Sequence, residues 1–233
     1  MTPDTVMIFA AGRGTRMRTL TQDRPKPMIP VAGRPLIEHA LDMAVAAGLR
    51  RAVVNTHYLP APLEAHLSRE TRLSITLSPE TELLETGGGL KRAAPLLGLG
   101  PVFTMNADVV WQGPDPFGAL VSGGVPGPGG ARLLLVPRAN AVGHPGAGDF
   151  ALDQSGRPVR RGDAPEAPFV YTGLQLIDPA AALAVPEPVF SLNRLWDAML
   201  AQGRLRATVW TGRWCDVGQP GSIPLAEAML ADG

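Results

Sequence analysis

The residues best suited to chemistry gather in one glycine-rich segment, which reads AAGRGTRMRTLTQDRPKPMIP over residues 10–30. Its small residues let backbone N–H groups approach a polyphosphate closely and donate hydrogen bonds to it. Arg16 and Lys26 add positive charge for the phosphates, and the prolines on either side of Lys26 stiffen the backbone around it. The segment predicts a polyphosphate site with the loop residues Ala10, Ala11, Gly12, Gly14 and Thr15.

Two familiar phosphate motifs do not fit this loop. The dinucleotide fingerprint requires a third glycine, and Met17 stands at that position. The P-loop ends in Gly-Lys-Ser or Gly-Lys-Thr, whereas residues 14–16 read Gly-Thr-Arg. An exposed glycine turn with incidental arginines is the remaining alternative, and the proline-bracketed Lys26 argues against it.

Two aspartates are candidates for a metal site. Asp108 comes shortly after an apolar run at 101–105, and Asp216 lies far downstream in the segment WCDVG. A carboxylate just past a parallel strand points into the crevice at the strand ends. Magnesium is usually held by one or two carboxylates together with substrate phosphates. We therefore expect Asp108 and Asp216 to bind Mg²⁺, with a turn or helix-cap role as the alternative for each.

A second glycine-rich segment, LETGGG at 84–89, follows Glu80 and opens a predicted helix. Its glycines would let a base or ribose lie against the backbone. Glu80 and Thr86 carry polar groups that can read the edge of a base, although a plain helix start with a threonine cap is the alternative. The expected nucleotide contacts in this part of the chain are Glu80, Thr86, Gly87 and Asn106.

Alternating strands and helices must position these loops. Apolar runs predict strands at 6–10, 51–56, 73–77 and 101–105. Helices are predicted at 34–48, 60–69 and 88–97. This alternation is typical of a parallel sheet covered on both faces, with the loops after Ala10, Leu77 and Met105 around one crevice.

The second half of the chain is less regular. Strands are expected near 131–137, 149–152, 168–177 and 205–210, and helices near 190–202 and 220–231. The run GGVPGPGG at 123–130 is either a linker or a long surface loop, and we favour a loop inside one domain.

Composition excludes several classes of partner. The 233 residues hold 21 Lys and Arg against 21 Asp and Glu, which gives no global electrostatic case for nucleic acid or for a membrane. No apolar stretch approaches the roughly 20 residues of a membrane span, and the N-terminus lacks the basic region of a secretory signal. The single cysteine, Cys215, excludes an intrachain disulfide and fits a reducing compartment. We expect a cytoplasmic protein.

The motifs AAGxGTRM…LT…PKP and VAGRPLIEHAL resemble the signature of sugar-phosphate nucleotidyltransferases, and NADV and WCDVG resemble the family's two metal motifs. Thr19 is a departure, because the family usually has proline there. The resemblance implies a Rossmann-like α/β fold of the nucleotide-diphospho-sugar transferase type, a mostly parallel mixed sheet with helices on both faces. It also implies an enzyme that joins a nucleoside triphosphate to a sugar 1-phosphate and releases pyrophosphate, with Mg²⁺ as cofactor and with Arg16 and Lys26 as catalytic residues.

The segments LETGGG and HPGAGDFALD (144–153) are similar to those of the short bacterial N-acetylmuramate 1-phosphate uridylyltransferases of cell-wall recycling. This resemblance implies UTP and N-acetylmuramate 1-phosphate as substrates. The sugar contacts that it implies are Gly148, Asp149, Glu166, Thr172 and Gly173. The alternatives are mannose or glucose 1-phosphate with GTP, UTP or dTTP, a non-catalytic nucleotide-sugar sensor, and an NAD-binding module.

We expect one domain over residues 1–233, with a nucleotide-binding half at 1–122 and a sugar-phosphate-binding half at 131–233. Larger family members continue past the second metal motif into a β-helix or an acyltransferase domain, and the family's common assembly contacts are C-terminal. This chain ends soon after that motif, so we expect a monomer. The four histidines, His39, His57, His66 and His144, lack metal-ligand spacing and are expected to be surface, core or loop residues.

Overall fold

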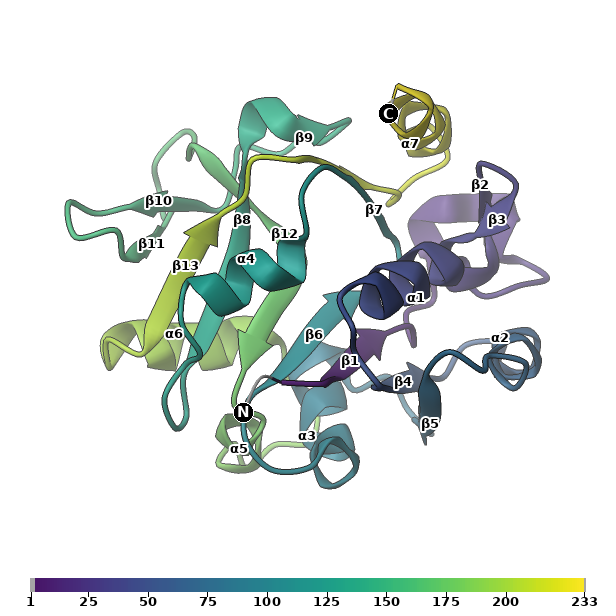
Figure 1. The fold of residues 1–233 in the computed structure, drawn as a ribbon, viewed down its shortest axis with the longest axis horizontal. Helices are drawn as coiled ribbons and strands as arrows, with labels where there is room; N and C mark the ends of the chain where they lie inside the picture. The colour runs from purple at the N-terminus through teal and green to yellow at the C-terminus, as the bar shows by residue number, and fades with distance from the viewer. Residues whose placement is uncertain (1–2, 233) are drawn as a thin grey trace.

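A computed structural model of the chain describes residues 3–232. Its centre is a nine-stranded sheet with the order β11-β10-β12-β6-β1-β4-β5, in which β8 also pairs with β12 and β13 (Figure 1). The strands of this sheet are β1 (Thr5–Phe9), β4 (Arg51–Thr56), β5 (Ser74–Pro79), β6 (Val102–Asn106), β8 (Ala131–Pro137), β10 (Phe150–Leu152), β11 (Pro158–Arg160), β12 (Phe169–Ile177) and β13 (Leu205–Val209).

Strand direction differs between the two parts of this sheet. β1 is parallel to β4 and β6, and β4 is parallel to β5. β12 runs antiparallel to β6 and β8, whereas β13 is parallel to β8. The protein therefore has the predicted α/β fold with a mixed sheet, and its parallel part carries the N-terminal loops at the carboxyl ends of the strands.

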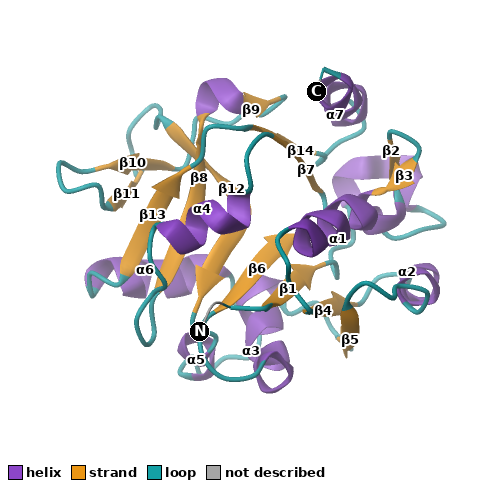
Figure 2. Cartoon of the chain, viewed as in Figure 1, coloured by secondary structure: helices purple, strands orange, loops and turns teal. Residues whose placement is uncertain are grey.

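Helices cover both faces of the sheet (Figures 1 and 2). Those on one face are α1 (Leu36–Ala46), α2 (Pro60–Leu67) and α4 (Pro116–Ser122), and those on the other are α3 (Glu85–Leu97), α5 (Ala180–Leu183) and α6 (Leu192–Ala201). Successive side chains of a strand point to opposite faces, so Val6 and Ile8 join one apolar cluster and Met7 joins the other. Burial on both faces explains why β1, β4 and β6 read as nearly continuous apolar runs, whereas the more exposed edge strand β5 alternates.

A smaller three-stranded sheet stands beside the large one. It has the order β7-β14-β9, formed by β7 (Val109–Gln112), β14 (Arg213–Asp216) and β9 (Ala141–Val142). Helix α7 (Ser222–Ala231) packs against it, and Met17, Cys215 and Met229 share its buried apolar cluster. This sheet therefore joins the C-terminal part of the chain to the segment that follows β6.

Short elements complete the fold. They are the two-stranded sheet of β2 (Pro30–Val31) and β3 (Arg34–Pro35) and the 3-10 turns η1 (Thr15–Thr21), η2 (Lys26–Met28) and η3 (Arg138–Asn140). Residues 123–130 connect α4 to β8. No helix within residues 3–232 has the length and apolar character needed to cross a membrane.

The sequence predicted the main elements better than their ends. The strands expected at 51–56 and 131–137 occur there, whereas the helix expected from residue 88 begins at Glu85. β7, β14 and α4 were not predicted. β7 and β14 have only four residues each and form by pairing with one another, so local periodicity does not reveal them.

Candidate active site

The predicted polyphosphate loop leaves β1 and turns into η1. Gly14 has a φ of +63°, a left-handed conformation that suits glycine, and the Met17 N–H donates to its carbonyl at 2.8 Å. A Cβ atom at Gly12 would meet no atom within 4 Å. Packing therefore does not require a glycine at position 12, and the open space beside it leaves room for a ligand against the backbone.

Lys26 belongs to the same packed unit as the loop. The residue is only 8 % exposed, and its ammonium forms an ion pair with the carboxylate of Asp108. A Cβ atom at Gly14 would lie 3.0 Å from the Lys26 Cβ. The absence of a side chain at Gly14 thus lets the loop pack on the lysine stem and hold its ammonium near Asp108.

The small sheet brings together the two aspartates predicted to bind metal. Asp216 ends β14 opposite Val109 on β7, and the Val217 N–H donates to the Asp108 carbonyl at 2.9 Å. A Cβ atom at Gly218 would lie 2.9 Å from Asp216 Oδ2 and 3.3 Å from Arg16 Nη2. Arg16 therefore lies beside Asp216.

Burial and a neighbouring negative charge disfavour the ionised form of Asp216. Burial and then the neighbouring Asp108 charge raise the pKa of Asp216, against the opposing influence of Lys26, Arg16 and His144. Two adjacent carboxylates supply hard oxygen ligands, and relief of their repulsion fits a divalent cation. Within residues 3–232 no cluster of three or more His, Cys, Asp or Glu side chains could hold a metal, so any further ligands would come from substrate or water.

A cavity of about 390 Å³, the first cavity, opens between Asp108 and the second glycine-rich segment. Its lining includes six of the predicted site residues, Ala11, Gly12, Glu80, Thr86, Asn106 and Asp108. The loops after β1, β5 and β6 meet around it, as the strand order predicts. One crevice thus joins the polyphosphate loop to the candidate base contacts.

Asn55 is a lining residue that the sequence reasoning missed. It is 3 % exposed, accepts the Ala10 N–H at 2.7 Å and donates to Glu80 Oε1 at 2.7 Å. Glu80 Oε2 in turn accepts the Leu84 N–H at 3.1 Å. This buried chain ties the polyphosphate loop to the second glycine-rich segment. Asn55 lies near the carboxyl end of β4, so the strand-end rule that selected Asp108 would also have found it.

The sequence predicts that the glycines of LETGGG leave the backbone open to a ligand, and at Gly87 the structure shows protein there instead. The Gly87 N–H donates to the Phe190 carbonyl at 2.9 Å, and a Cβ atom at Gly87 would collide with the Phe190 ring. The space beside Gly87 is therefore filled by protein, because α3 and the segment before α6 approach closely. The Thr86 hydroxyl lines the first cavity and accepts the Leu192 N–H at 3.0 Å.

A second cavity of about 270 Å³ continues from the first and shares Thr86, Asn106 and Ser191 with it. Its other lining residues are Asp149, Phe150, Arg160, Tyr171, Leu192, Asn193 and Trp196. Asp149 is thus the predicted sugar residue that this cavity contains. Its Oδ2 accepts the Tyr171 N–H at 2.9 Å.

The other predicted sugar residues have different surroundings. The Thr172 hydroxyl is fully buried and donates to the Leu134 carbonyl at 2.9 Å. Gly173 has a φ of +82° and lets Asn106 pack against the backbone of β12. Gly148 similarly allows close contact with the Ala167 carbonyl. Glu166 is 68 % exposed at its side chain and pairs with Arg138 at 2.6 Å, outside both cavities.

A cavity larger than either of these two lies elsewhere. It measures about 570 Å³, is lined mainly by α5 and α6, and contains none of the predicted site residues. The chemistry of the lining, rather than cavity size, therefore assigns the candidate site to the two connected cavities.

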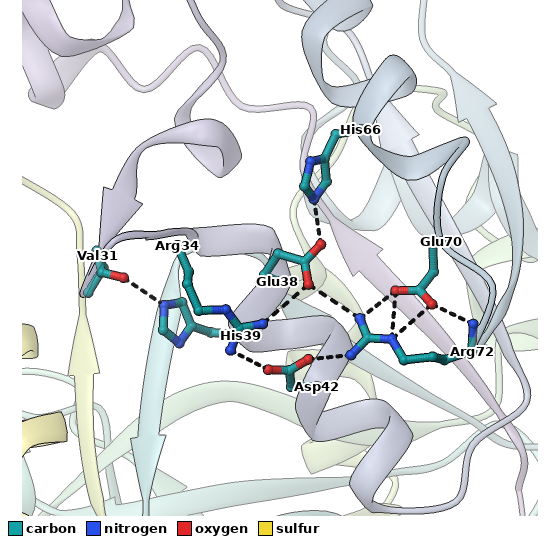
Figure 3. A network of polar contacts seen from close by, with 8 residues as sticks. All are labelled: Val31, Arg34, Glu38, His39, Asp42, His66, Glu70 and Arg72. Atoms are coloured by element: carbon teal, nitrogen blue, oxygen red, sulfur yellow. Dashed lines mark hydrogen bonds and ion pairs between the residues drawn. The ribbon is translucent and has the colours of Figure 1, made fainter.

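A second charged cluster, the helix cluster, is formed by side chains of β3, α1, α2 and the segment after α2 (Figure 3). Its members are Arg34, Glu38, Asp42, His66, Glu70 and Arg72. Arg72 binds Asp42 at 2.6 Å and Glu70 at 2.5 Å, and its hydrogen bonds lower the pKa of Glu70 to about 2. His66 contacts Glu38 at 2.5 Å, so this histidine belongs to a surface network.

His144 lies closer to the site than the sequence suggested. Its ring centroid is 6.1 Å from that of Trp214, and its proximity to Asp216 opposes the rise in the pKa of that carboxyl. Within residues 3–232 its Nε2 is buried without a hydrogen-bond partner.

Comparisons with known proteins agree with this geometry. Residues 5–122 match the nucleotidyl transferase family. An N-acetylmuramate alpha-1-phosphate uridylyltransferase of Caulobacter vibrioides is 42 % identical over 99 % of this chain and 98 % of its own length. The chain belongs to the nucleotidyl transferase family. This nucleotidyltransferase acts in sugar-1-phosphate nucleotidyl transfer.

Other relatives extend the comparison. A second N-acetylmuramate alpha-1-phosphate uridylyltransferase, from Neisseria meningitidis, is 34 % identical over 96 % of each chain. A mannose-1-phosphate guanylyltransferase of Mycobacterium tuberculosis is 29 % identical over 97 % of this chain and 64 % of its own length. The inositol-1-phosphate CTP transferase from T. maritima has the same fold, with a TM-score of 0.82 at 16 % identity, over 99 % of this chain and 96 % of that one.

Proposed function

We propose that the protein transfers uridylate from UTP to N-acetylmuramate 1-phosphate, giving the UDP-sugar and pyrophosphate. The observation that carries this proposal is the 42 % identity to a uridylyltransferase of that specificity over 99 % of the chain. The short segments 84–89 and 144–153, which resemble that class, also lie at the candidate site. We further propose a monomeric cytoplasmic enzyme, in keeping with its free buried cysteine.

The catalytic roles follow from the packed charges. The acceptor phosphate oxygen attacks the α-phosphorus of UTP directly, so no covalent enzyme intermediate is required. Gly12, Gly14 and Thr15 bind the triphosphate through the backbone, and Arg16 and Lys26 stabilise the charge that develops on the departing pyrophosphate. Lys26 already pairs with one carboxylate, which places its ammonium where it can exchange that partner for a phosphate.

Asp108 and Asp216 would hold Mg²⁺, which when bound neutralises phosphate charge. Base recognition is assigned to the first cavity, where Ala10, Ala11, Glu80, Thr86, Gly87 and Asn106 line or support the walls. Sugar recognition is assigned to the second cavity and its surroundings, with Asp149 in the lining and Gly148, Glu166, Thr172 and Gly173 nearby. In the first cavity, Glu80 acts together with Asn55, because its carboxylate is held by the Asn55 side chain.

A pyrophosphate-release screen tests this proposal. The four common nucleoside triphosphates, with Mg²⁺, are crossed with the 1-phosphates of N-acetylmuramate, N-acetylglucosamine, glucose and mannose. The proposal predicts the highest kcat/KM for UTP with N-acetylmuramate 1-phosphate. Preference for GTP with mannose 1-phosphate would move the enzyme to the specificity of its guanylyltransferase relatives, and no release from folded protein would favour a non-catalytic sensor.

A further inference from the structure

The second cavity contains a cationic side chain that has no assigned role in the transfer of the nucleotidyl group. Among residues 3–232, Arg160 is the only cationic side chain that lines this cavity. The cavity adjoins the first one through Thr86, Asn106 and Ser191, so an acceptor bound beside the nucleotide extends into it. Arg16 and Lys26, which are assigned to the phosphates, do not line the second cavity.

Two aromatic rings lie against the guanidinium of Arg160. Its guanidinium carbon lies 5.0 Å from the centroid of the Phe150 ring and 5.4 Å from that of Trp196. Both rings line the same cavity. Such stacking favours a guanidinium and restricts its rotation, so the group is organised before a ligand arrives.

The hydrogen bonds of Arg160 leave capacity for a ligand. Its Nε and Nη2 donate to Asp197 Oδ1 at 3.0 and 2.8 Å, and its Nη1 and Nη2 donate to Asn193 Oδ1 and to the Asn193 carbonyl at 3.0 and 3.2 Å. A guanidinium has five N–H donors, so one N–H on Nη1 remains. Asp197 is 63 % exposed at its side chain, against 30 % for Arg160. A carboxylate bound inside the cavity can therefore share the guanidinium or replace this outer partner.

Two backbone N–H groups at the start of α6 are already hydrogen-bonded within the protein, so they do not offer a site for an anion. The Leu192 N–H donates to the Thr86 hydroxyl at 3.0 Å, and the Asn193 N–H donates to the Ser191 hydroxyl at 3.3 Å. These two backbone donors of the cavity wall are already used, which leaves Arg160 as the charged donor for an anion.

We propose that Arg160 binds the carboxylate of the acceptor sugar and thereby selects an acidic sugar 1-phosphate over its neutral counterparts. The inference rests on the proposed function, because N-acetylmuramate differs from N-acetylglucosamine only by a lactyl ether that ends in a carboxylate. A charge-assisted hydrogen bond to that group would be lost with every neutral sugar. Arg160 thus acts as a specificity residue, separate from the groups that bind the reacting phosphates.

The test compares wild type with Arg160→Gln and Arg160→Lys on the 1-phosphates of N-acetylmuramate and N-acetylglucosamine. We expect Arg160→Gln to lower kcat/KM for N-acetylmuramate 1-phosphate by about 10- to 100-fold, mainly through KM, with the lysine variant in between. The KM for UTP and the activity with N-acetylglucosamine 1-phosphate should change by less than about threefold. Arg194→Gln is the matched control, because Arg194 is on α6, pairs with Glu187 at 2.8 Å and lines the remote cavity instead.

Several outcomes would overturn the proposal. An equal loss for both sugars, or a parallel rise in the KM for UTP, would give Arg160 a structural role through Asn193 and Asp197. An unchanged KM for N-acetylmuramate 1-phosphate would remove Arg160 from recognition while the proposed reaction stands. Wild-type preference for a neutral sugar would reject both the substrate and this role of Arg160. If a neutral sugar shows no turnover in wild type, its inhibition constant replaces kcat/KM in the comparison.

Discussion

Two charged clusters in this protein contain similar residues but have opposite energetics. In the site cluster, formed by Arg16, Lys26, Asp108 and Asp216, burial and Asp108 raise the pKa of Asp216. In the helix cluster, Arg72 lowers the pKa of Glu70 to about 2. The helix cluster therefore favours its charges in the folded protein, whereas the site cluster keeps one carboxylate under repulsion. Such unfavourable charge is expected where a ligand completes the electrostatics.

The largest effect should follow from neutralising the paired carboxylate of the site cluster. Asp108→Asn removes the partner of Lys26 and one ligand of the expected cation. We expect turnover to fall by about 10²- to 10³-fold, the usual loss for one group that stabilises transition-state charge. Glu38→Gln in the helix cluster is the matched control and should leave turnover within about twofold. Pyrophosphate release under saturating substrates measures both, and near-normal turnover of Asp108→Asn would reject its role.

Asp216→Asn should separate function from stability. The raised pKa means that the folded state disfavours the ionised carboxyl, so its charge costs stability at neutral pH. This cost declines as pH falls below the raised value and is gone below the unfolded pKa near 3.8. We therefore expect the asparagine variant to lose turnover and to gain free energy of unfolding in metal-free urea titrations at pH 7. A less stable variant would show that the attraction to Arg16 and Lys26 outweighs the repulsion.

Arg72→Ala, in the helix cluster, should lower the free energy of unfolding and leave turnover unchanged. The depressed pKa of Glu70 means that the pair contributes stability above the unfolded pKa near 4.5, and this contribution is lost as pH falls towards about 2. Because Arg72 is 42 % exposed at its side chain, we expect a loss of only about 0.5–1 kcal/mol at pH 7, smaller at high salt. Turnover should not change. A loss that persists at pH 2 would point to packing rather than charge.

The smallest predicted effect concerns Cys215, the neighbour of Asp216. Burial and then the Asp216 charge raise the pKa of this thiol to about 11. At pH 8 only about one thiolate in a thousand is expected, so a thiol reagent should react with the folded protein only after unfolding. Asp216→Asn should lower the thiol pKa slightly by removing the second of these causes. Rapid labelling of native wild type at pH 8 would contradict the burial of this segment.

Sequence reasoning predicted which loops gather around one crevice better than it predicted the surroundings of individual residues. The strand-end rule placed the loops after β1, β5 and β6 around one crevice, because this rule depends on topology alone. It did not reveal how Asp216 arrives there, since β14 is ordered by pairing with β7 and not by its own periodicity. Gly12 and Gly87 both lie in glycine-rich segments, but Gly12 faces open space and Gly87 faces Phe190. That difference arises from the packing of distant segments.

Arg160 illustrates the same limit. Nothing in the local sequence distinguishes it from its neighbour Arg161, which donates to the Gly148 carbonyl at 3.0 Å instead. Its place in the second cavity depends on Phe150 and Trp196, which come from a different strand and a distant helix. Residues that read a substrate through such tertiary contacts carry little signal in one sequence.

The most direct test of the account is a product analysis by mass spectrometry. The purified protein is incubated with UTP, Mg²⁺ and equal concentrations of the 1-phosphates of N-acetylmuramate and N-acetylglucosamine. We expect UDP-N-acetylmuramate to form in excess, with one pyrophosphate released for each product molecule. Preferential formation of UDP-N-acetylglucosamine, or no nucleotide sugar from folded protein, would contradict it.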